Sequence, residues 1–487
     1  MANRGEIALR VMRTCRELGI ATVAVYSDID RASPHVRAAD EAYPIGAAAP
    51  RESYLNADRI IATAKRSGCD AIHPGYGFLS ENADFADAVV AAGLLFVGPP
   101  GPVQRAVGEK TSARRLAVKA GVPVAEGAMQ PIRDEAEART IAERVGYPIL
   151  LKPAGGGGGK GMRIVRAAAE LTGAWRAATG EATTAFGAPA LLLERLIEHA
   201  RHVEVQLFAD AHGTVVSLGE RDCSIQRRHQ KLIEECPGPG VDEALRAKLG
   251  AAAARIAAAA GYVNAGTAEF LVAPDGSFFF LEMNTRLQVE HPVTELVTGL
   301  DLVALQLRVA AGEPLGFGQA DVRLSGAAIE LRITAEDPFA GFLPQGGRVD
   351  FLRESGGPGI RMDSGLSAPM TVPTEYDPLL AKLIAWGPDR HTALARARRA
   401  VRETIVAGLP TSLPFHSFVL GERDFLSGRY DTDYVATHWA PPQAAELSES
   451  GAIAAALAGI TRLRSAPRPV AIEAGPWVRS ARDDMLR

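Results

Sequence analysis

The sequence has few cysteines, and no secretory leader is expected at its start. Its four cysteines, Cys15, Cys69, Cys223 and Cys236, lie far apart, and no two of them form a C-x-x-C pair. This spacing argues against a disulfide scaffold or a zinc site and favours a reducing compartment, the cytoplasm. An acid, Glu6, lies where the apolar run of a signal peptide would begin, so no such peptide is predicted.

The chain also lacks a membrane-length apolar run and a block of basic residues. Its most apolar stretch, 250–262, is rich in alanine and interrupted by Arg255, which predicts a buried helix. Lys and Arg total 53 against 57 Asp and Glu, and no basic block stands out, so neither nucleic acid nor a membrane is an expected partner. At 487 residues the chain is too long for one hydrophobic core, which predicts roughly three domains.

The first predicted domain, residues 1–108, alternates between helical and strand patterns. The segments are a helix over 7–18, a strand over 21–26, a helix over 54–66, a strand over 71–73, a helix over 82–92 and a strand over 94–97. Such alternation predicts an α/β fold with a parallel, doubly wound, Rossmann-like sheet. The chain begins on a helix, with no strand before it.

Two further units and a tail are expected after this domain. Residues 109–198 hold a helix over 135–144 and strands over 148–152, 162–165 and 190–194 around a glycine run. Residues 199–436 hold strands over 202–208, 267–272 and 278–283, with an alanine-rich helix over 243–260. Residues 437–487 are predicted to be a linker and tail with one apolar helical piece, 451–460.

A glycine loop joins two of these strands. Lys152 and Lys160 flank five consecutive glycines, Gly155–Gly159. Glycines let backbone N–H groups converge on an anion, and the lysines can neutralise phosphate. Gly161 follows where a Walker A motif needs Ser or Thr, so we expect a different, mobile phosphate-binding lid. The alternative is a flexible linker.

A hairpin brings two carboxylates together. Asp275-Gly276 between apolar runs predicts a two-residue turn, and counting outward pairs Glu269 with Glu282 and Thr267 with Asn284. Opposed acids repel unless a cation lies between them. With the Asn284 oxygen they form a hard oxygen cluster suited to Mg²⁺. The alternative is a pair of exposed acids.

Charged residues continue past this hairpin. Arg286, Gln288 and Glu290 alternate along the chain. A guanidinium near Mg-phosphate suits a planar anion, and a carboxylate there suits a general base. A surface loop with a salt bridge is the alternative for this stretch alone.

Together the motifs resemble biotin carboxylase, an enzyme of the ATP-grasp superfamily. The resemblance covers residues 2 to about 436. The segments that carry it are His73–Asn82, the glycine loop, Arg201–Gln206, Glu220–Lys231, Glu282–Glu295 and Arg332–Pro338. It implies a three-domain ATP-grasp fold and a reaction in which ATP phosphorylates bicarbonate to carboxyphosphate. That species breaks down to CO₂, and N1 of biotin is carboxylated.

The resemblance also implies roles for individual residues. Those expected to hold ATP are Lys110, Lys152, Gly158, Gly159, Glu194, Leu196, His202, Gln226, His229, Glu269 and Glu282. Those expected to hold Mg²⁺ or Mn²⁺ are Glu269, Glu282 and Asn284. Lys231, Arg286, Gln288 and Val289 would position bicarbonate, Glu290 would deprotonate it, and Arg332 would stabilise the ureido oxygen of biotin.

Two residues of the segments that carry the resemblance allow a second interpretation. His202 shares a strand face with Glu204 and Gln206, and a polar outward face would explain this alternation without any ligand. Cys223 has no evident activating base, so we interpret it as structural.

The sequence departs from the family at both ends. The strand that normally precedes Ala2 is missing, which suggests a misassigned start or a trimmed sequence; a genuine loss would destabilise the first domain. The Ala-Met-Lys-Met segment that carries biotin is absent, so the carrier is expected to act in trans or to have been cut off. Gly475-Pro-Trp-Val is similar to the region that follows the carboxylase part in fused acyl-CoA carboxylase α subunits.

The expected partners are a biotin carboxyl carrier protein or domain and a carboxyltransferase subunit, in a homodimer or a larger complex. Two rival functions remain: another ATP-grasp ligase, such as a carbamoyl-phosphate or amino-acid ligase, and a non-catalytic subunit kept for assembly. The sequence does not identify the acyl-CoA that is finally carboxylated.

Overall fold

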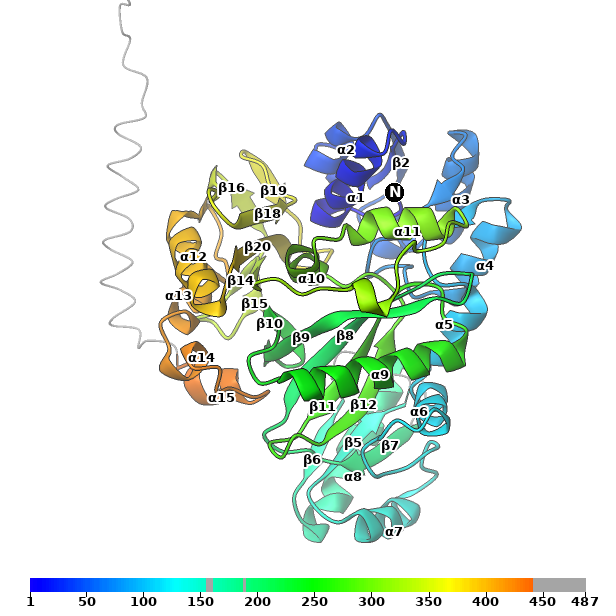
Figure 1. Cartoon of the computed structure of the whole chain (residues 1–487), viewed down its shortest axis with the longest axis vertical. Helices are drawn as coiled ribbons and strands as arrows, with labels where there is room; N and C mark the ends of the chain where they lie inside the picture. Colours follow the sequence, from blue (N-terminus) through cyan, green and yellow to red (C-terminus); the bar gives the residue numbers. More distant parts are fainter. Residues whose placement is uncertain (155–160, 187–189, 441–487) are drawn as a thin grey trace, which may run out of the picture. The chain divides into compact units, whose positions relative to one another are not determined.

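The computed structural model describes residues 1–154, 161–186 and 190–440 (Figure 1). Residues Met1–Trp439 form one unit. The predicted tail helix over 451–460 and the glycines Gly158 and Gly159 lie outside the described residues. No helix among the described residues is long and apolar enough to cross a membrane.

The first region contains the predicted parallel strands, arranged as two separate pairs. The elements are α1 (Gly5–Glu17), β1 (Val23–Ser27), β2 (Glu41–Gly46), α3 (Ala57–Arg66), β3 (Ala71–Ile72), α4 (Ala83–Ala91) and β4 (Leu95–Phe96). β1 pairs with β2, and β3 pairs with β4, both in parallel. The sequence pattern did not predict β2, whose side chains are mostly partly exposed.

The start of the chain lies between these two pairs. The Met1 amino group donates to the Val23 carbonyl at 2.7 Å, and the Ala2 amide donates to the His73 carbonyl at 2.9 Å. Residues 1–4, all described, form no strand before α1. Residues 1 and 2 therefore bridge β1 and the end of β3 at the position where the missing strand was expected.

The three strands predicted in the second unit are present, and they form a small antiparallel sheet. Its order is β6-β5-β7, from β5 (Ile149–Pro153), β6 (Arg163–Val165) and β7 (Leu191–Arg195). Helices α7 (Glu135–Val145) and α8 (Leu171–Phe186) pack against it around a shared apolar core. Asp134 begins α7 by accepting a hydrogen bond from the Glu137 amide, which satisfies a free donor of the first turn.

An eight-stranded antiparallel sheet forms the rest of the unit. Its order is β12-β11-β8-β9-β10-β13-β20-β18. The strands are β8 (Arg201–Ala209), β9 (Val215–Arg227), β10 (Gln230–Cys236), β11 (Asn264–Val272), β12 (Phe278–Asn284), β13 (Ala327–Thr334), β18 (Ile360–Ser364) and β20 (Leu379–Gly387).

Helices cover both faces of this sheet. The alanine-rich α9 (Glu243–Ala260) packs on β8 and β9 (Figure 1), because its small side chains let the helix approach the strands closely. Asp242 caps its first turn, and Gly261 in the left-handed region ends it. α10 (His291–Thr298) and α12 (Arg390–Glu403) both pack on β13 and β20, and the core residues of β13 that contact each helix alternate.

The turn between β11 and β12 differs from the prediction. The loop has three residues, 274–276, because the Ala273 amide donates to the Ser277 carbonyl at 2.8 Å. Gly276 has a φ of +82°, the left-handed value that a three-residue hairpin loop favours at this position. The two-residue turn predicted at Asp275-Gly276 is therefore wrong.

The predicted pairing at the far end of the hairpin is nevertheless confirmed. Glu269 lies opposite Glu282, and Thr267 lies opposite Asn284. Next to Glu269 the register shifts by one residue, since Phe270 pairs with Phe280. This irregularity compensates for the extra turn residue.

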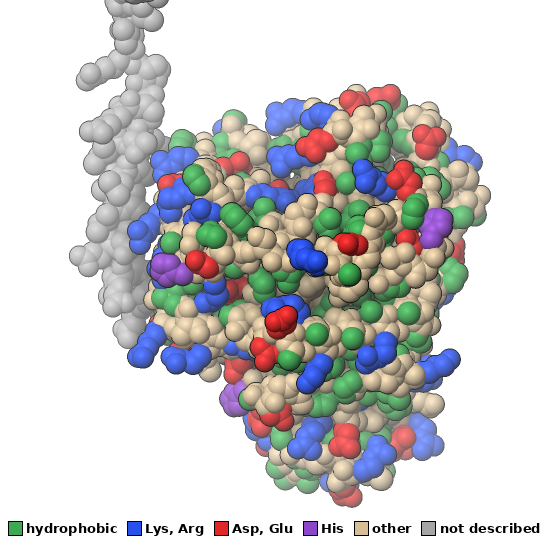
Figure 2. All heavy atoms as spheres, in the orientation of Figure 1, with side chains coloured by type: hydrophobic (Ala, Val, Ile, Leu, Met, Phe, Trp, Pro, Cys, Tyr) green, Lys and Arg blue, Asp and Glu red, His purple; other side chains and the backbone are tan. Residues whose placement is uncertain are grey.

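Charges of both signs are mixed on the surface. On the face drawn in Figure 2, blue and red side chains are interspersed over the main sheet and its helices. This agrees with the scattered basic residues in the sequence.

Candidate functional site

One face of β8 carries buried polar side chains into the sheet centre. His202, Glu204 and Gln206 are 7%, 0% and 0% exposed. The alternative of a solvent-facing polar strand is therefore wrong, because the side chains of Arg221, Glu269 and, from α10, Thr294 lie over this face. The His202 Nε2 atom lies 2.9 Å from Glu269 Oε2, which links β8 to the predicted metal cluster.

Lys231 on β10 is the centre of the site. Its Nζ donates to Glu204, to Glu269 Oε1 at 2.9 Å and to Glu290 Oε1 at 2.8 Å. Burial lowers the pKa of Lys231, but the three carboxylates outweigh burial and raise this pKa well above its ordinary value. The ammonium is therefore a fixed positive charge that joins three strands and a helix.

Glu290 lies at the start of α10 and is fully buried. Its second oxygen accepts a hydrogen bond from Arg332 Nη2 at 2.9 Å. Burial raises the pKa of Glu290, but Lys231, Arg332 and Arg221 together hold this pKa well below its ordinary value. The side chain is thus a carboxylate, the form that a proton acceptor needs.

Arg286 is fixed by acceptors on three sides. Its Nε donates to Glu81 Oε2 at 2.9 Å, Nη1 donates to Gln288 Oε1 at 3.0 Å, and Nη2 donates to Asn284 Oδ1 at 3.3 Å. Glu81 also accepts from the Thr285 amide at 3.0 Å. A guanidinium held in this way presents its plane in one orientation, as recognition of a planar anion requires.

The two opposed acids fit a divalent cation. Burial and the neighbouring Glu269 charge raise the pKa of Glu282. Burial would also raise the pKa of Glu269, but the positive charges of Lys231 and His202 outweigh burial and lower it. A cation between them would remove the repulsion that raises the pKa of Glu282. Asn284 directs its Nδ2 toward Glu269 Oε1 at 2.8 Å, so its amide must rotate to offer the oxygen expected as a ligand.

The residues expected to bind nucleotide lie near β5 and β7. Lys152 Nζ is 2.6 Å from Glu194 Oε2, which Arg114 Nη1 also contacts at 2.9 Å. Burial lowers the pKa of Lys110 against the attraction of Glu282. The Leu196 amide donates to the Pro148 carbonyl at 3.0 Å and is therefore already used within the protein.

Two further residues expected to bind ATP lie near Lys231, one on a strand and one in a turn. Gln226 is buried near the end of β9, and His229 is exposed in the turn before β10 with a φ of +65°. Cys223 is buried with its Sγ 4.0 Å from Glu290 Oε1, and burial raises the pKa of its thiol well above the ordinary value. A neutral buried thiol agrees with a structural role.

The sequence did not assign five residues that hold the site. Arg221 is fully buried and donates to Glu204, Gln206, Thr294 and Thr267. Glu234 accepts from Arg332, and Glu81 accepts from Arg286. Lys382 donates to the Val289 carbonyl at 2.8 Å. Glu204 is the fifth. Its alternation with His202 was a visible signal, but it equally fitted an exposed strand.

The fold and the site together define the class of protein, an ATP-grasp ligase. The defining features are a small antiparallel sheet, a larger antiparallel sheet and paired acids that face lysines. Comparison with family models agrees. The carbamoyl-phosphate synthase L chain ATP-binding domain matches residues 109–317, and the N-terminal and C-terminal domains of biotin carboxylase match residues 1–103 and 330–437.

Individual proteins narrow the class. The chain is 50% identical over 435 residues to a biotin carboxylase of Nostoc sp., covering 89% of this chain and 97% of that one. It is 48% identical over 440 residues to the mitochondrial methylcrotonoyl-CoA carboxylase subunit alpha of Arabidopsis thaliana, covering 90% and 60%. The biotin carboxylase domain dimer of the Hydrogenobacter thermophilus 2-oxoglutarate carboxylase, solved with MgADP, ADP and bicarbonate, matches with a TM-score of 0.87 and 45% identity, covering 90% and 96%.

The chain therefore belongs to the biotin carboxylase family. It is an enzyme that carboxylates biotin at the expense of ATP. The rival functions of another ATP-grasp ligase and of a non-catalytic subunit are set aside by this membership.

Proposed function

We propose that Glu290 is the general base for bicarbonate and that Lys231, Arg286, Gln288 and Val289 position this anion. The observation that carries the proposal is the burial of the Glu290 carboxylate between Lys231 and Arg332, at 2.8 and 2.9 Å. These two cations keep the carboxylate ionised, and one of them, Lys231, can also bind the anion whose proton Glu290 accepts.

The reaction then proceeds in three steps. Glu290 removes the proton of bicarbonate, and the carbonate oxygen attacks the γ-phosphorus of ATP, releasing ADP and forming carboxyphosphate. Carboxyphosphate breaks down to CO₂ and phosphate. Biotin N1 loses its proton to phosphate and attacks CO₂, while Arg332 stabilises the negative charge that develops on the ureido oxygen.

The nucleotide is assigned to residues of the small sheet and of the neighbouring strands of the large sheet. Lys110, Lys152, Glu194, Leu196, His202, Gln226 and His229 would contact ATP, together with Gly158 and Gly159. Glu269, Glu282 and Asn284 would hold Mg²⁺ or Mn²⁺, which when bound neutralises phosphate charge. The paired acids and the raised pKa of Glu282 support this assignment.

We also propose the wider organisation. Residues 1–108, 109–198 and 199–436 would be the N-terminal, lid and C-terminal domains, followed by a linker and tail over 437–487. A biotin carboxyl carrier protein would act in trans, a carboxyltransferase would use the product, and the chain would work in the cytoplasm as a homodimer or in a larger carboxylase complex. The dimeric Hydrogenobacter relative supports the assembly.

The test is ADP release by the purified chain, measured with bicarbonate in the presence and absence of free biotin. Wild type should require bicarbonate and be stimulated by biotin. Glu290→Gln should lower the rate by about a hundredfold or more, the contribution of a general base, whereas exposed Glu354→Gln should not. Full activity of Glu290→Gln would refute the assignment of the base.

A further inference from the structure

Two buried carboxyls behind Arg332 have no role in the scheme above. Glu330 on β13 lies directly opposite Glu234 on β10. On the other side, β20 places Lys382 opposite Arg332 and Ile384 opposite Glu330. Alternation along β13 puts Glu330 and Arg332 on the same face, which is the face that packs toward α10.

Both carboxyls are fully shielded from solvent. Glu330 and Glu234 are each 0% exposed. Within the described residues, neither oxygen of Glu330 and only one oxygen of Glu234 has a hydrogen-bond partner, and Glu330 forms no ion pair. Beyond Glu330 this face becomes apolar, with Ala328 and Ile384 packed against α10. An ionised carboxylate without a partner would be very unfavourable there.

Burial outweighs the surrounding charges, which act on the pKa of Glu330 in both directions. Burial raises the pKa of Glu330 well above its ordinary value, and Glu234 and Glu290 raise it further against Lys382 and Arg332. Burial raises the pKa of Glu234 to about 7, although Arg332 lowers it. Two opposed carboxyls in one apolar site ionise one at a time.

The other charged groups near this face are already engaged. Lys382 Nζ donates to the Val289 carbonyl and lies 3.2 Å from Glu6. On α10, His291 Nδ1 lies 2.7 Å from the Gln288 carbonyl, and Glu295 accepts from two arginines of other elements. Arg332 alone is shared between Glu234 and Glu290.

We propose that Glu330 is held as a neutral acid that keeps its proton and donates a hydrogen bond to Glu234, and that this pair positions Arg332 for the biotin step. With Glu330 neutral, Glu234 keeps its charge and holds Arg332 Nε at 2.6 Å. Without that anchor, Arg332 would turn wholly to Glu290 and would no longer be aimed at the ureido oxygen. The inference rests on the proposed role of Arg332 in the function above.

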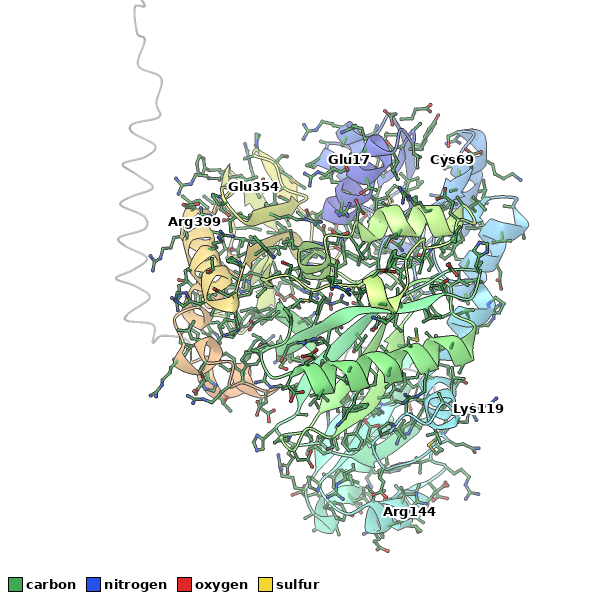
Figure 3. The ribbon with its side chains drawn as sticks, in the orientation of Figure 1. Glu17, Cys69, Lys119, Arg144, Glu354 and Arg399 are labelled. Carbon is green, nitrogen blue, oxygen red and sulfur yellow. The ribbon has the colours of Figure 1, made fainter. Side chains whose placement is uncertain are left out.

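The variants that test this differ in one property. Glu330→Gln is neutral and keeps an N–H donor for Glu234, whereas Glu330→Leu is neutral and has no donor. In Glu330→Leu, biotin-stimulated turnover should fall about tenfold, as expected when a charge-assisted hydrogen bond is lost. Glu330→Gln should recover most of that loss. Glu354→Leu, on an exposed segment (Figure 3), is the matched control.

A second assay separates positioning from general damage. Bicarbonate-dependent ADP release without biotin uses Glu290 but not Arg332 in its proposed role, so it should change less than twofold in Glu330→Leu. Equal loss of both activities would indicate a merely structural role and overturn the proposal. So would equal loss in Gln and Leu variants, or no loss in either. Absence of bicarbonate-dependent ADP release from wild type would instead overturn the proposed function.

Infrared spectroscopy tests the proton itself and does not depend on folding of the Leu variant. Wild type at neutral pH should show the carbonyl-stretch band of a protonated, buried carboxylic acid. Glu330→Gln should lose that band. A wild-type spectrum without it, or a band that persists unchanged in Glu330→Gln, would refute the assignment of the proton to Glu330.

Discussion

Lys382 connects the predicted bicarbonate site to the first region of the chain. It is fully buried, donates to the Val289 carbonyl at 2.8 Å and lies 3.2 Å from Glu6 Oε1. Lys382→Met keeps the volume and removes the charge, leaving Glu6 buried without its cation. Breaking such a pair costs about 3–5 kcal/mol. Because the unfolding entropy grows with the size of the cooperative unit, here Met1–Trp439, each kcal/mol lowers the thermal midpoint by roughly 1 °C, and the midpoint should fall by about 3–5 °C.

The same change should weaken bicarbonate binding. The Val289 carbonyl loses its donor next to Glu290, so the segment that positions the anion is no longer held. We expect the KM for bicarbonate, measured by ADP release, to rise about tenfold. Lys248→Met, at an exposed position on α9, should change neither the KM nor the midpoint measured by calorimetry.

A double variant separates the two effects. Lys382→Met combined with Glu6→Gln removes both charges, so the double variant should recover about half of the decrease in thermal midpoint. The KM should stay high, because the Val289 carbonyl still lacks its partner. If the double variant is no more stable than Lys382→Met, or if its KM returns to the wild-type value, the reasoning is refuted.

Three further predictions follow from other contacts. Glu81→Gln should raise the KM for bicarbonate by about threefold to tenfold, since it weakens the charge-assisted bond that orients Arg286; an unchanged KM in steady-state kinetics would contradict this. Glu282→Gln should raise the Mg²⁺ concentration that gives half-maximal ADP release, and an unchanged Mg²⁺ titration would exclude it as a ligand. Burial lowers the pKa of His35 to about 4. As the pH falls from about 6.5 to 4, the unfolded state therefore binds a proton on His35 that the folded state does not. This difference lowers the free energy of unfolding by about 3 kcal/mol across that window. His35→Leu should remove most of that pH dependence, as measured by urea unfolding at each pH.

The sequence predicted local geometry well where the two-residue alternation of side chains along a strand determines it. The opposition of Glu269 and Glu282 followed from strand alternation and the position of the turn. Yet the turn has one more residue than predicted, and a shift beside Glu269 compensates for it. The correct pairing thus depended on two deviations that cancel, and only the backbone of the folded sheet reveals either of them.

Burial and long-range partners could not be predicted in the same way. His202 alternates with two polar residues, a pattern that fits an exposed face, but it is 7% exposed and contacts Glu269 from a neighbouring strand. Glu81 and Arg286 are separated by 205 residues along the chain, so no local pattern connects them. Such contacts depend on how the first region packs against the main sheet.

The fold also distinguishes the two buried acids that contact Lys231 and could serve as the proposed base. Glu204 and Glu290 are both fully buried and both accept from Lys231. The other partner of Glu204 is Arg221, whose side chain is 0% exposed, whereas the other partner of Glu290 is Arg332, whose side chain is 16% exposed. A substrate anion can reach the cations of Glu290 but not the guanidinium of Glu204. This difference supports the proposal that Glu290 is the acid that accepts the bicarbonate proton, while Glu204 holds Lys231 in place.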